Sequence, residues 1–327
     1  MKIAIIGAGL IGRKRALALP KGIIIKTVCN RSKEKGLSFA KEFNCNYVRD
    51  WKKAVDDKEI QAVIIATNHR FLSPIAIRAI SNGKHVLIEK PGARNLKELK
   101  MIYKAHKKHK VVVVFGYNHR YHPAIQKAKQ LVDSRKYGPV LFIRARYGHG
   151  GRLGYEKEWR FQKGTSGGGE LMDQGPHLID LSNYFIGKMN HVIGYTARLF
   201  WNAPIEDTAF LIIKNNKNQF AHISVTCVEW KNIFSFEIML KTAKIQIDGL
   251  GGSYGDEKLT LYKMKPEMGP PNVEEFSFKK KDLSWKKENK IFFEKIRNKD
   301  YSSTLIEDAI YVLAVVDKVY KQNPKFL

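Results

Sequence analysis

The spacing of apolar residues divides the chain into two parts near Asn118. Before this point, short apolar runs of strand length alternate with segments in which apolar residues recur at helical spacing. Strands that alternate with helices form a parallel, doubly wound sheet, so we predict an α/β Rossmann domain over residues 1–118 that binds a dinucleotide. Its predicted strands cover residues 2–6, 23–29, 62–67, 84–89 and 111–115, and its predicted helices cover residues 10–19, 33–43, 73–82 and 95–109.

The pattern changes after Asn118, where strand-length runs follow one another with hairpin-length connections. We predict an α+β domain over residues 119–327 with a large, open, mainly antiparallel sheet for substrate binding and oligomerisation. One face of that sheet would be free to carry a partner subunit, and the last helix could return to the first domain. The predicted strands cover residues 140–147, 191–201, 208–214, 220–230, 233–240, 244–248, 258–264 and 273–278, and the predicted helices cover residues 123–136, 170–185 and 303–320.

The first predicted strand ends in a glycine-rich turn, Gly7-x-Gly9-x-x-Gly12, directly before the first helix. Gly7 would let the chain turn sharply, Gly9 would let bare backbone approach a pyrophosphate, and Gly12 would let the helix pack closely on the strand. The phosphates would sit at the helix N-terminus, where free N–H groups favour anions. A secretory signal is not indicated, because Arg13-Lys14-Arg15 stands where a cleavage site would need small residues.

The residues after the second predicted strand bear on the choice of cofactor. A site for NAD places an acidic residue here to accept from the ribose 2′-hydroxyl, whereas this chain has Asn30-Arg31-Ser32. An uncharged Asn30 does not repel a 2′-phosphate, and Arg31 with Ser32 could hold one, so the pattern favours NADP over NAD. An exposed Arg31 stacked on adenine would be compatible with either cofactor.

Two places in the chain carry side chains suited to proton transfer. Lys90 stands between a strand end and Pro91, and a partly desolvated lysine beside a nicotinamide could exchange a proton with a hydroxyl; one more surface lysine is the alternative. Asp173 and His177 flank Gly175-Pro176, a helix break that could turn both side chains into one cavity. A carboxylate beside a histidine fixes its tautomer and stabilises the imidazolium, although a purely structural His177 is also compatible with the spacing.

Composition narrows the class of protein further. The 327 residues suit two domains, and no apolar run reaches the length of a membrane span. Three widely spaced cysteines give neither a disulfide framework nor a metal site, so we expect a soluble, cytoplasmic protein without metal. The net charge of +27 comes from lysines scattered over every segment, which favours a solvated basic surface over a nucleic-acid site and could attract an anionic substrate.

Four sequence blocks in this order resemble the Gfo/Idh/MocA oxidoreductases over the full chain: the glycine turn, AISNGKHVLIEKP from Ala79 to Pro91, GYNHR from Gly116 to Arg120, and GGGELMDQGPHLIDL from Gly167 to Leu181. The resemblance implies hydride exchange between NAD(P) and a secondary alcohol of a sugar, nucleotide sugar or cyclitol, and assembly into homodimers or homotetramers. It implies catalytic roles for Lys90, Asp173 and His177, with a cis peptide between Lys90 and Pro91. Implied cofactor-binding residues are Gly7, Gly9, Leu10, Ile11, Gly12, Asn30, Arg31, Ser32, Thr67, Asn68, Glu89 and Lys90.

Substrate contacts are expected from the loop after Tyr147, which mixes aromatic faces with cations suited to a sugar that carries phosphate, nucleotide or carboxylate. Anchoring of the loop is the alternative role for each of its residues. A protein of the same fold that holds NAD(P) as a sensor and catalyses nothing is the alternative function. The predicted substrate contacts are Asn118, Arg120, Arg152, Tyr155, Trp159, Arg160 and His177.

Overall fold

A computed structural model describes residues 1–279, 282–302 and 304–326. The chain forms two compact units. Unit 1 contains Met1–Asn118 and Trp285–Leu313, and unit 2 contains His119–Ser284 and the described part of Ala314–Leu327. Unit 1 is therefore built from two separate stretches of chain, and the second stretch includes the first part of the last helix.

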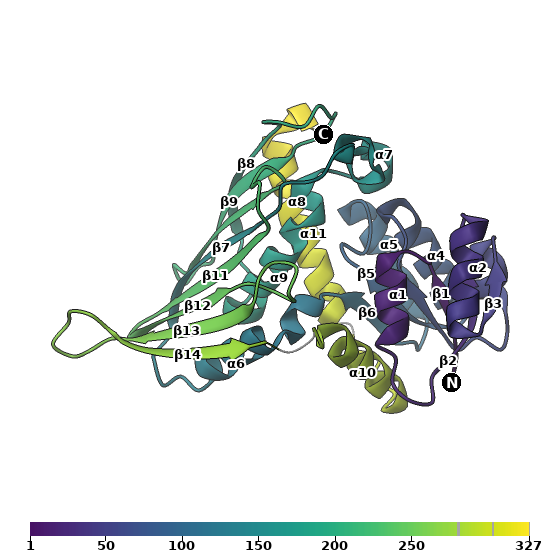
Figure 1. Cartoon of the computed structure of the whole chain (residues 1–327), viewed down its shortest axis with the longest axis horizontal. Helices are drawn as coiled ribbons and strands as arrows, with labels where there is room; N and C mark the ends of the chain where they lie inside the picture. Colours follow the sequence, from purple (N-terminus) through teal and green to yellow (C-terminus); the bar gives the residue numbers. More distant parts are fainter. Residues whose placement is uncertain (280–281, 303, 327) are drawn as a thin grey trace. The chain divides into compact units, whose positions relative to one another are not determined.

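Unit 1 has a parallel sheet of six strands in the order β3-β2-β1-β4-β5-β6, so the predicted doubly wound fold is confirmed (Figure 1). The order reverses between β1 and β4, which is where such sheets open a crevice for a ligand at their carboxyl ends. The short strand β3 was not predicted. The strands are β1 (Lys2–Ile6), β2 (Ile24–Cys29), β3 (Asn46–Val48), β4 (Ala62–Ile65), β5 (His85–Glu89) and β6 (Val113–Gly116).

The helices of unit 1 differ from the prediction in two ways. Helix α4 begins at His69, four residues before the predicted start, and Pro74 lies inside it. Two helices, α3 and α10, were not predicted, and α10 brings Phe292 and Phe293 into the core beneath the sheet. The helices are α1 (Leu10–Leu17), α2 (Lys33–Phe43), α3 (Trp51–Asp56), α4 (His69–Ser81), α5 (Leu96–Lys108), α10 (Ser284–Arg297, in this unit from Trp285) and the first part of α11 (Thr304–Gln322).

Unit 2 has a sheet of eight strands in the order β14-β13-β12-β11-β7-β10-β9-β8. All neighbouring strands are antiparallel except β7 and β10, which run parallel, so the predicted mainly antiparallel sheet is confirmed. The strands are β7 (Val140–Gly148), β8 (His191–Ala197), β9 (Thr208–Lys214), β10 (Phe220–Thr226), β11 (Ile233–Leu240), β12 (Ala243–Asp248), β13 (Glu257–Lys263) and β14 (Asn272–Phe278).

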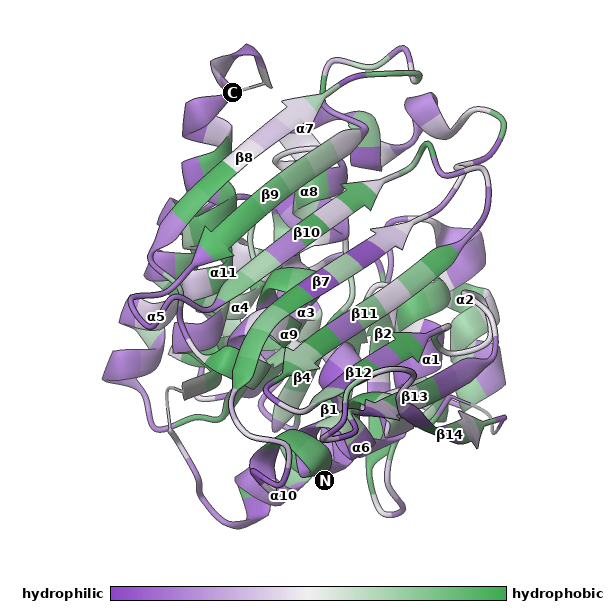
Figure 2. Cartoon of the chain, turned by 90° about the vertical axis from the view of Figure 1, so that its left-hand side faces the viewer, coloured by the Kyte–Doolittle hydropathy of each residue, from purple (hydrophilic) through white to green (hydrophobic). Residues whose placement is uncertain are grey.

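Helices pack on one face of this sheet, with α8 and α9 against its central strands and α6 at the β13 end. Figure 2 looks onto the opposite face, where the strands lie in front of the helices of this unit. The predicted helix over 170–185 is broken at Gln174 into α8 and α9, as expected from Gly175-Pro176. The helices of the unit are α6 (Pro123–Asp133), α7 (Lys163–Ser166), α8 (Glu170–Asp173), α9 (Gly175–Ile186) and the last part of α11, with short 3-10 turns at Asn118–Tyr121, Tyr155–Lys157, Trp159–Phe161 and Pro324–Phe326.

Ser303, the predicted start of the last helix, lies outside the described residues, as do Lys280, Lys281 and Leu327. Within the described ranges, no helix is long and apolar enough to cross a membrane. The same ranges contain no group of three or more His, Cys, Asp or Glu side chains placed to hold a metal ion.

Candidate active site

The three glycines of the first turn differ in what surrounds them. Gly7 has φ +110°, and a Cβ there would lie 2.2 Å from the carbonyl oxygen of Ala66. A Cβ on Gly12 would lie 1.9 Å from the carbonyl oxygen of Gly7. A Cβ on Gly9 would meet nothing within 4 Å. Gly7 and Gly12 are therefore required by the turn itself, whereas Gly9 leaves open space beside bare backbone.

The environment of Gly9 fits a dinucleotide. Gly9 is the N-cap of α1 and has no side chain that could satisfy the first N–H groups of the helix, which leaves them for an anion. Leu10 begins the helix and is exposed, and Ile11 is half-buried. The buried Oδ1 atom of Asn68, after β4, has no hydrogen-bond partner among the described residues, as a group kept for a ligand would require.

The side chain of Asn30 joins two loops at the carboxyl end of the sheet. Its Oδ1 accepts from the Ala8 N–H at 3.1 Å, and its Nδ2 donates to the Ser32 carbonyl at 3.0 Å. Ser32 caps α2 by accepting from the Lys35 N–H, and Arg31 is exposed beside it. The predicted site for the 2′ position of the cofactor ribose therefore has the oriented Asn30 amide and the exposed Arg31 guanidinium. The residue at the end of the strand is Asn30 and carries no carboxylate.

Glu89, which precedes Lys90, is held by a buried arginine. Arg15 of α1 has no exposed surface, and its Nε donates to the Glu89 carboxylate at 2.6 Å. Arg15 also pairs with Glu288 at 2.6 Å and donates to Asn289 at 3.2 Å, both on α10. Burial opposes the positive charge, but the two carboxylates outweigh it and raise the pKa of Arg15. Glu89 thus fixes the end of β5, and its predicted contact with a cofactor stays a prediction.

Lys90 follows directly, and its side chain is half-buried. The Lys90–Pro91 peptide is cis, as the resemblance implied. Thr67, after β4, donates its hydroxyl to the Asn68 carbonyl at 3.0 Å. The predicted cofactor residues thus lie in the loops after β1, β2, β4 and β5, in the first turn of α1 and at the last residue of β5, all at the carboxyl end of one parallel sheet.

In unit 2, His177 lies in the first turn of α9 and is buried. Its imidazole stacks on that of His119, with ring centroids 3.7 Å apart and planes inclined by 19°. Tyr147 contacts both rings edge-on. His119 stands between two predicted site residues, Asn118 and Arg120, but was not itself predicted.

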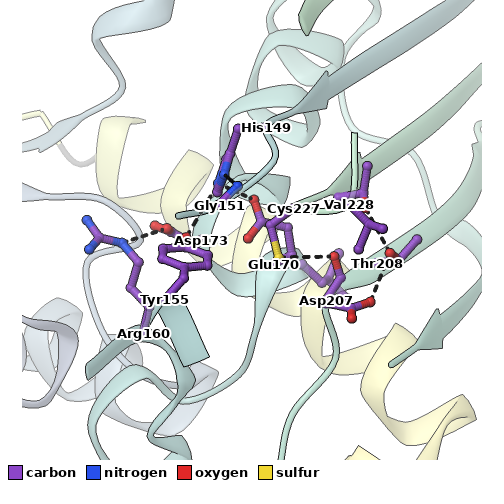
Figure 3. Close-up of polar contacts among 12 residues, drawn as sticks. His149, Gly151, Tyr155, Arg160, Glu170, Asp173, Asp207, Thr208, Cys227 and Val228 are labelled. Carbon is purple, nitrogen blue, oxygen red and sulfur yellow. Dashed lines mark hydrogen bonds and ion pairs between the residues drawn. The ribbon is translucent and has the colours of Figure 1, made fainter. Parts of the chain in front are cut away.

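Asp173 ends α8 and is paired with the loop that follows β7 (Figure 3). Its Oδ2 accepts from Nε of Arg160 at 3.1 Å, and Arg160 also donates to Glu158 at 3.2 Å. Near the other end of this loop, His149 lies 3.3 Å from Glu170, the first residue of α8 (Figure 3). Both ends of the loop are therefore fastened to the short helix that carries Asp173. No pattern in the sequence indicated the contact between His149 and Glu170.

Of the remaining predicted substrate contacts, all but Asn118 lie in unit 2 and have partners there. Arg120 is buried and forms a two-pronged ion pair with Asp180 at 2.7 and 2.6 Å. Arg152 is exposed and pairs with Glu158. Asn118, which belongs to unit 1, is buried, Tyr155 packs in a small aromatic core where burial raises its pKa, and Trp159 is half-exposed beneath the Arg160 guanidinium. These contacts support anchoring of the loop, and direct contact with a substrate stays a prediction for each residue.

The glycine run before α8 is packed against a second buried acid. The Glu206 Oε1 accepts from the Gly169 N–H at 3.0 Å, the Leu171 N–H at 3.2 Å and the Tyr320 hydroxyl at 2.6 Å. Burial raises the pKa of Glu206 to about 7. A Cβ on Gly168 would lie 1.9 Å from the Tyr320 hydroxyl oxygen. A Cβ on Gly169 would lie 1.8 Å from the carbonyl oxygen of Glu206. Gly168 is therefore excluded from carrying a side chain by Tyr320, and Gly169 by the Glu206 backbone, while the Glu206 carboxylate holds the start of α8.

Comparisons with known proteins extend over both units. Residues 1–117 match the model of the oxidoreductase family with an NAD-binding Rossmann fold, and residues 125–246 match the GFO/IDH/MocA C-terminal domain. Levoglucosan dehydrogenase of Pseudarthrobacter phenanthrenivorans is 31% identical over 59% of this chain and 53% of its own length. Glucose-6-phosphate 3-dehydrogenase of Bacillus subtilis is 32% identical over 56% of this chain and 53% of its own length. The chain thus spans about half the length of these curated relatives.

A solved structure of levoglucosan dehydrogenase in complex with NADH and L-sorbose has the same fold, with a TM-score of 0.89 at 22% identity over 99% of this chain and 97% of that one. The two family models match the Rossmann domain and the open-sheet domain in the order in which this chain has them. The chain therefore belongs to the Gfo/Idh/MocA family of oxidoreductases.

Proposed function

We propose that this protein is an NAD(P)-dependent dehydrogenase that oxidises a secondary hydroxyl of a sugar or cyclitol. The proposal rests on one observation: this member of the family combines a candidate cofactor site with a candidate pair of proton-transfer residues. Bare backbone at Gly9 faces open space at the head of α1, and the buried His177 and Asp173 lie on consecutive helices of the substrate unit. The names of the two curated relatives support the sugar class, one for an anhydro sugar and one for a sugar phosphate.

The cofactor is held by the loops at the carboxyl end of the parallel sheet. The α1 N-terminus binds the pyrophosphate, because its first N–H groups are not capped by a side chain. Arg31 and Ser32 take the 2′ position, and the absence of a carboxylate at Asn30 favours NADP over NAD. When bound, the nicotinamide ring supplies the acceptor for the hydride.

Three side chains act on the substrate hydroxyl or support the group that does. His177 accepts the proton of the sugar hydroxyl, and Asp173 stabilises the imidazolium that results. The Lys90 ammonium donates a hydrogen bond to the substrate oxygen as it becomes a carbonyl. Lys90 belongs to unit 1, whereas Asp173 and His177 belong to unit 2.

The first experiment measures turnover of the purified protein. A panel of neutral sugars, anhydro sugars, cyclitols and sugar phosphates is offered with NAD and with NADP, and reduction is followed at the nicotinamide absorbance band. We expect turnover with at least one sugar, and a higher kcat/KM with NADP than with NAD. Tight binding of NADPH without turnover on any member of the panel would instead favour a sensor of the same fold.

The second experiment tests Lys90. The Lys90→Met variant keeps the length of the side chain and removes its charge, so we expect turnover to fall by about 10³-fold or more while NADPH affinity stays within about twofold. Lys97→Met, an exposed lysine on α5, serves as the matched control and keeps full turnover. Undiminished turnover in Lys90→Met would remove Lys90 from the mechanism.

A further inference from the structure

His119 makes the closest ring contact of the predicted base. The His119 and His177 imidazoles are nearly parallel, with 3.7 Å between centroids and 19° between planes. Both rings are buried, and they come from segments about sixty residues apart, the 3-10 turn at Asn118–Tyr121 and helix α9. Such a stack uses the flat face of each ring, so it limits rotation of His177 about its terminal side-chain torsion.

The surroundings of His119 hold it in place for this contact. The Phe234 ring on β11 meets it edge-on at 5.9 Å, and Tyr147 on β7 does so at 5.4 Å. The His122 ring lies edge-on at 5.7 Å, and its Nδ1 is 3.0 Å from the Glu257 carboxylate. Strands β7, β11 and β13 of one sheet therefore support the His119 ring, directly or through His122.

His177 lies in the first turn of α9, directly after Pro176 and the helix break at Gln174. Its backbone N–H donates to the Gln174 carbonyl at 3.1 Å, which fixes the main chain but leaves the side-chain torsions to be set by the surrounding side chains. A general base must hold its nitrogen within hydrogen-bond reach of the proton that it removes.

Resting on the proposed function, we propose that His119 is a positioning residue whose ring, stacked on His177, fixes the plane in which His177 presents its nitrogens to the substrate hydroxyl. His119 acts through His177 and transfers no proton itself. A flat ring of similar size at position 119 therefore preserves the effect, and a small aliphatic side chain abolishes it.

The test compares His119→Ala with His119→Phe. We expect kcat of the alanine variant to fall between about tenfold and a hundredfold, because a misplaced catalytic group costs that much. KM and NADPH affinity stay within about twofold, since no substrate or cofactor contact is removed. The phenylalanine variant restores kcat to within about threefold of the wild type. His106→Ala, which removes an equally buried imidazole from unit 1, is the control and leaves kcat unchanged.

Two outcomes overturn the proposal. Wild-type kcat in His119→Ala shows that the stack is dispensable, and an equally low kcat in His119→Phe shows that the imidazole chemistry of His119, and not its flat face, is required. Thermal melting of each variant separates loss of fold from loss of positioning. His177→Ala must lose turnover in the same assays, which tests the proposed function separately from the stack.

A readout that does not depend on turnover keeps the stack testable even if no sugar is oxidised. Because the two rings are stacked, we expect the ring current of His119 to shift the ring protons of His177 upfield in NMR spectra of the folded protein. We expect the upfield shift to persist in His119→Phe and to disappear in His119→Ala. An unchanged His177 signal in His119→Ala overturns the proposal whatever the enzyme does.

Discussion

Two arginines on the same helix illustrate how burial decides the value of a charge. Arg15 has no exposed surface and joins Glu89 to Glu288, whereas Arg13 is exposed and pairs with Glu42 at the surface. An exposed pair gains little over water, but removal of one member of a buried cluster leaves the other charges without compensation. The two residues therefore provide a matched comparison within α1.

Arg15→Met should reduce the free energy of unfolding by about 3–5 kcal/mol, because Glu89 and Glu288 would remain buried without their cation. Arg13→Met should cost less than about 1 kcal/mol. Urea unfolding of both variants at pH 7 measures the difference. Equal effects would show that the Arg15 cluster contributes no more than a surface ion pair.

At the scale of elements, two glycines in the turn between β1 and α1 have different roles. Gly12 is needed for folding, and we expect Gly9 to be needed for cofactor binding. Gly12→Ala places a Cβ against the Gly7 carbonyl, so we expect a loss of several kcal/mol in stability or no folded protein. Gly9→Ala places its Cβ in open space and should fold with an unchanged melting temperature. It should nevertheless weaken NADPH binding by about tenfold or more, because the methyl group occupies the approach of the pyrophosphate.

Fluorescence titration of NADPH and thermal melting distinguish these effects. Normal NADPH affinity in Gly9→Ala would contradict the placement of the pyrophosphate beside this residue. A fully stable Gly12→Ala protein would show that α1 can move away from β1 without cost.

The elements that the sequence predicted share one property, an apolar face with a regular period. Helix α2 has its predicted bounds, and so do strands β9 and β11. Helix α10 was missed because part of what it buries is polar, namely Glu288 and Asn289, whose role depends on Arg15 far away in the chain. The predicted start of α4, residue 73, is four residues too late. Proline favours the first turn of a helix, which agrees with a start at residue 73, but Pro74 lies inside the observed helix.

The candidate site could be predicted where a residue type has a local reason, and not where it depends on a distant partner. The glycines of the first turn have such a reason, since backbone atoms close by exclude a Cβ at Gly7 and Gly12. The stack of His119 on His177 and the contact of His149 with Glu170 join separate elements, so no spacing in the sequence reveals them. The roles of Lys90, Asp173 and His177 in catalysis stay predictions.

At the scale of the whole molecule, strands β8 and β9 of the eight-stranded sheet carry apolar side chains that are exposed in the single chain. Figure 2 looks onto the face of the sheet away from the helices of its unit. Ile193 on β8 lies opposite Ile212 on β9, and Tyr195 lies opposite Phe210, with exposures of 48% to 71%. A contiguous apolar patch of this kind is typical of an interface. We infer that a second copy covers it, in keeping with the homodimer or homotetramer that the family resemblance implies.

Ile193→Asp combined with Ile212→Asp places charges at the centre of that patch. We expect the double variant to be a folded monomer when the wild type is a dimer or tetramer by light scattering, because desolvation of the carboxylates opposes association. Leu37→Asp, an exposed apolar position on α2, should not change the oligomeric state. A monomeric wild type would exclude this interface.

The Arg15 cluster also bears on how the chain folds as it is made. Arg15 and its partner Asn289 are separated by 274 positions, so at about 5–20 residues per second a ribosome needs roughly 14–55 seconds to supply the second after the first. The last strand of the parallel sheet, β6, ends at Gly116, so all six strands are synthesised long before Glu288 and Asn289. The surroundings of Arg15 can therefore be completed only when almost the whole polypeptide has been synthesised.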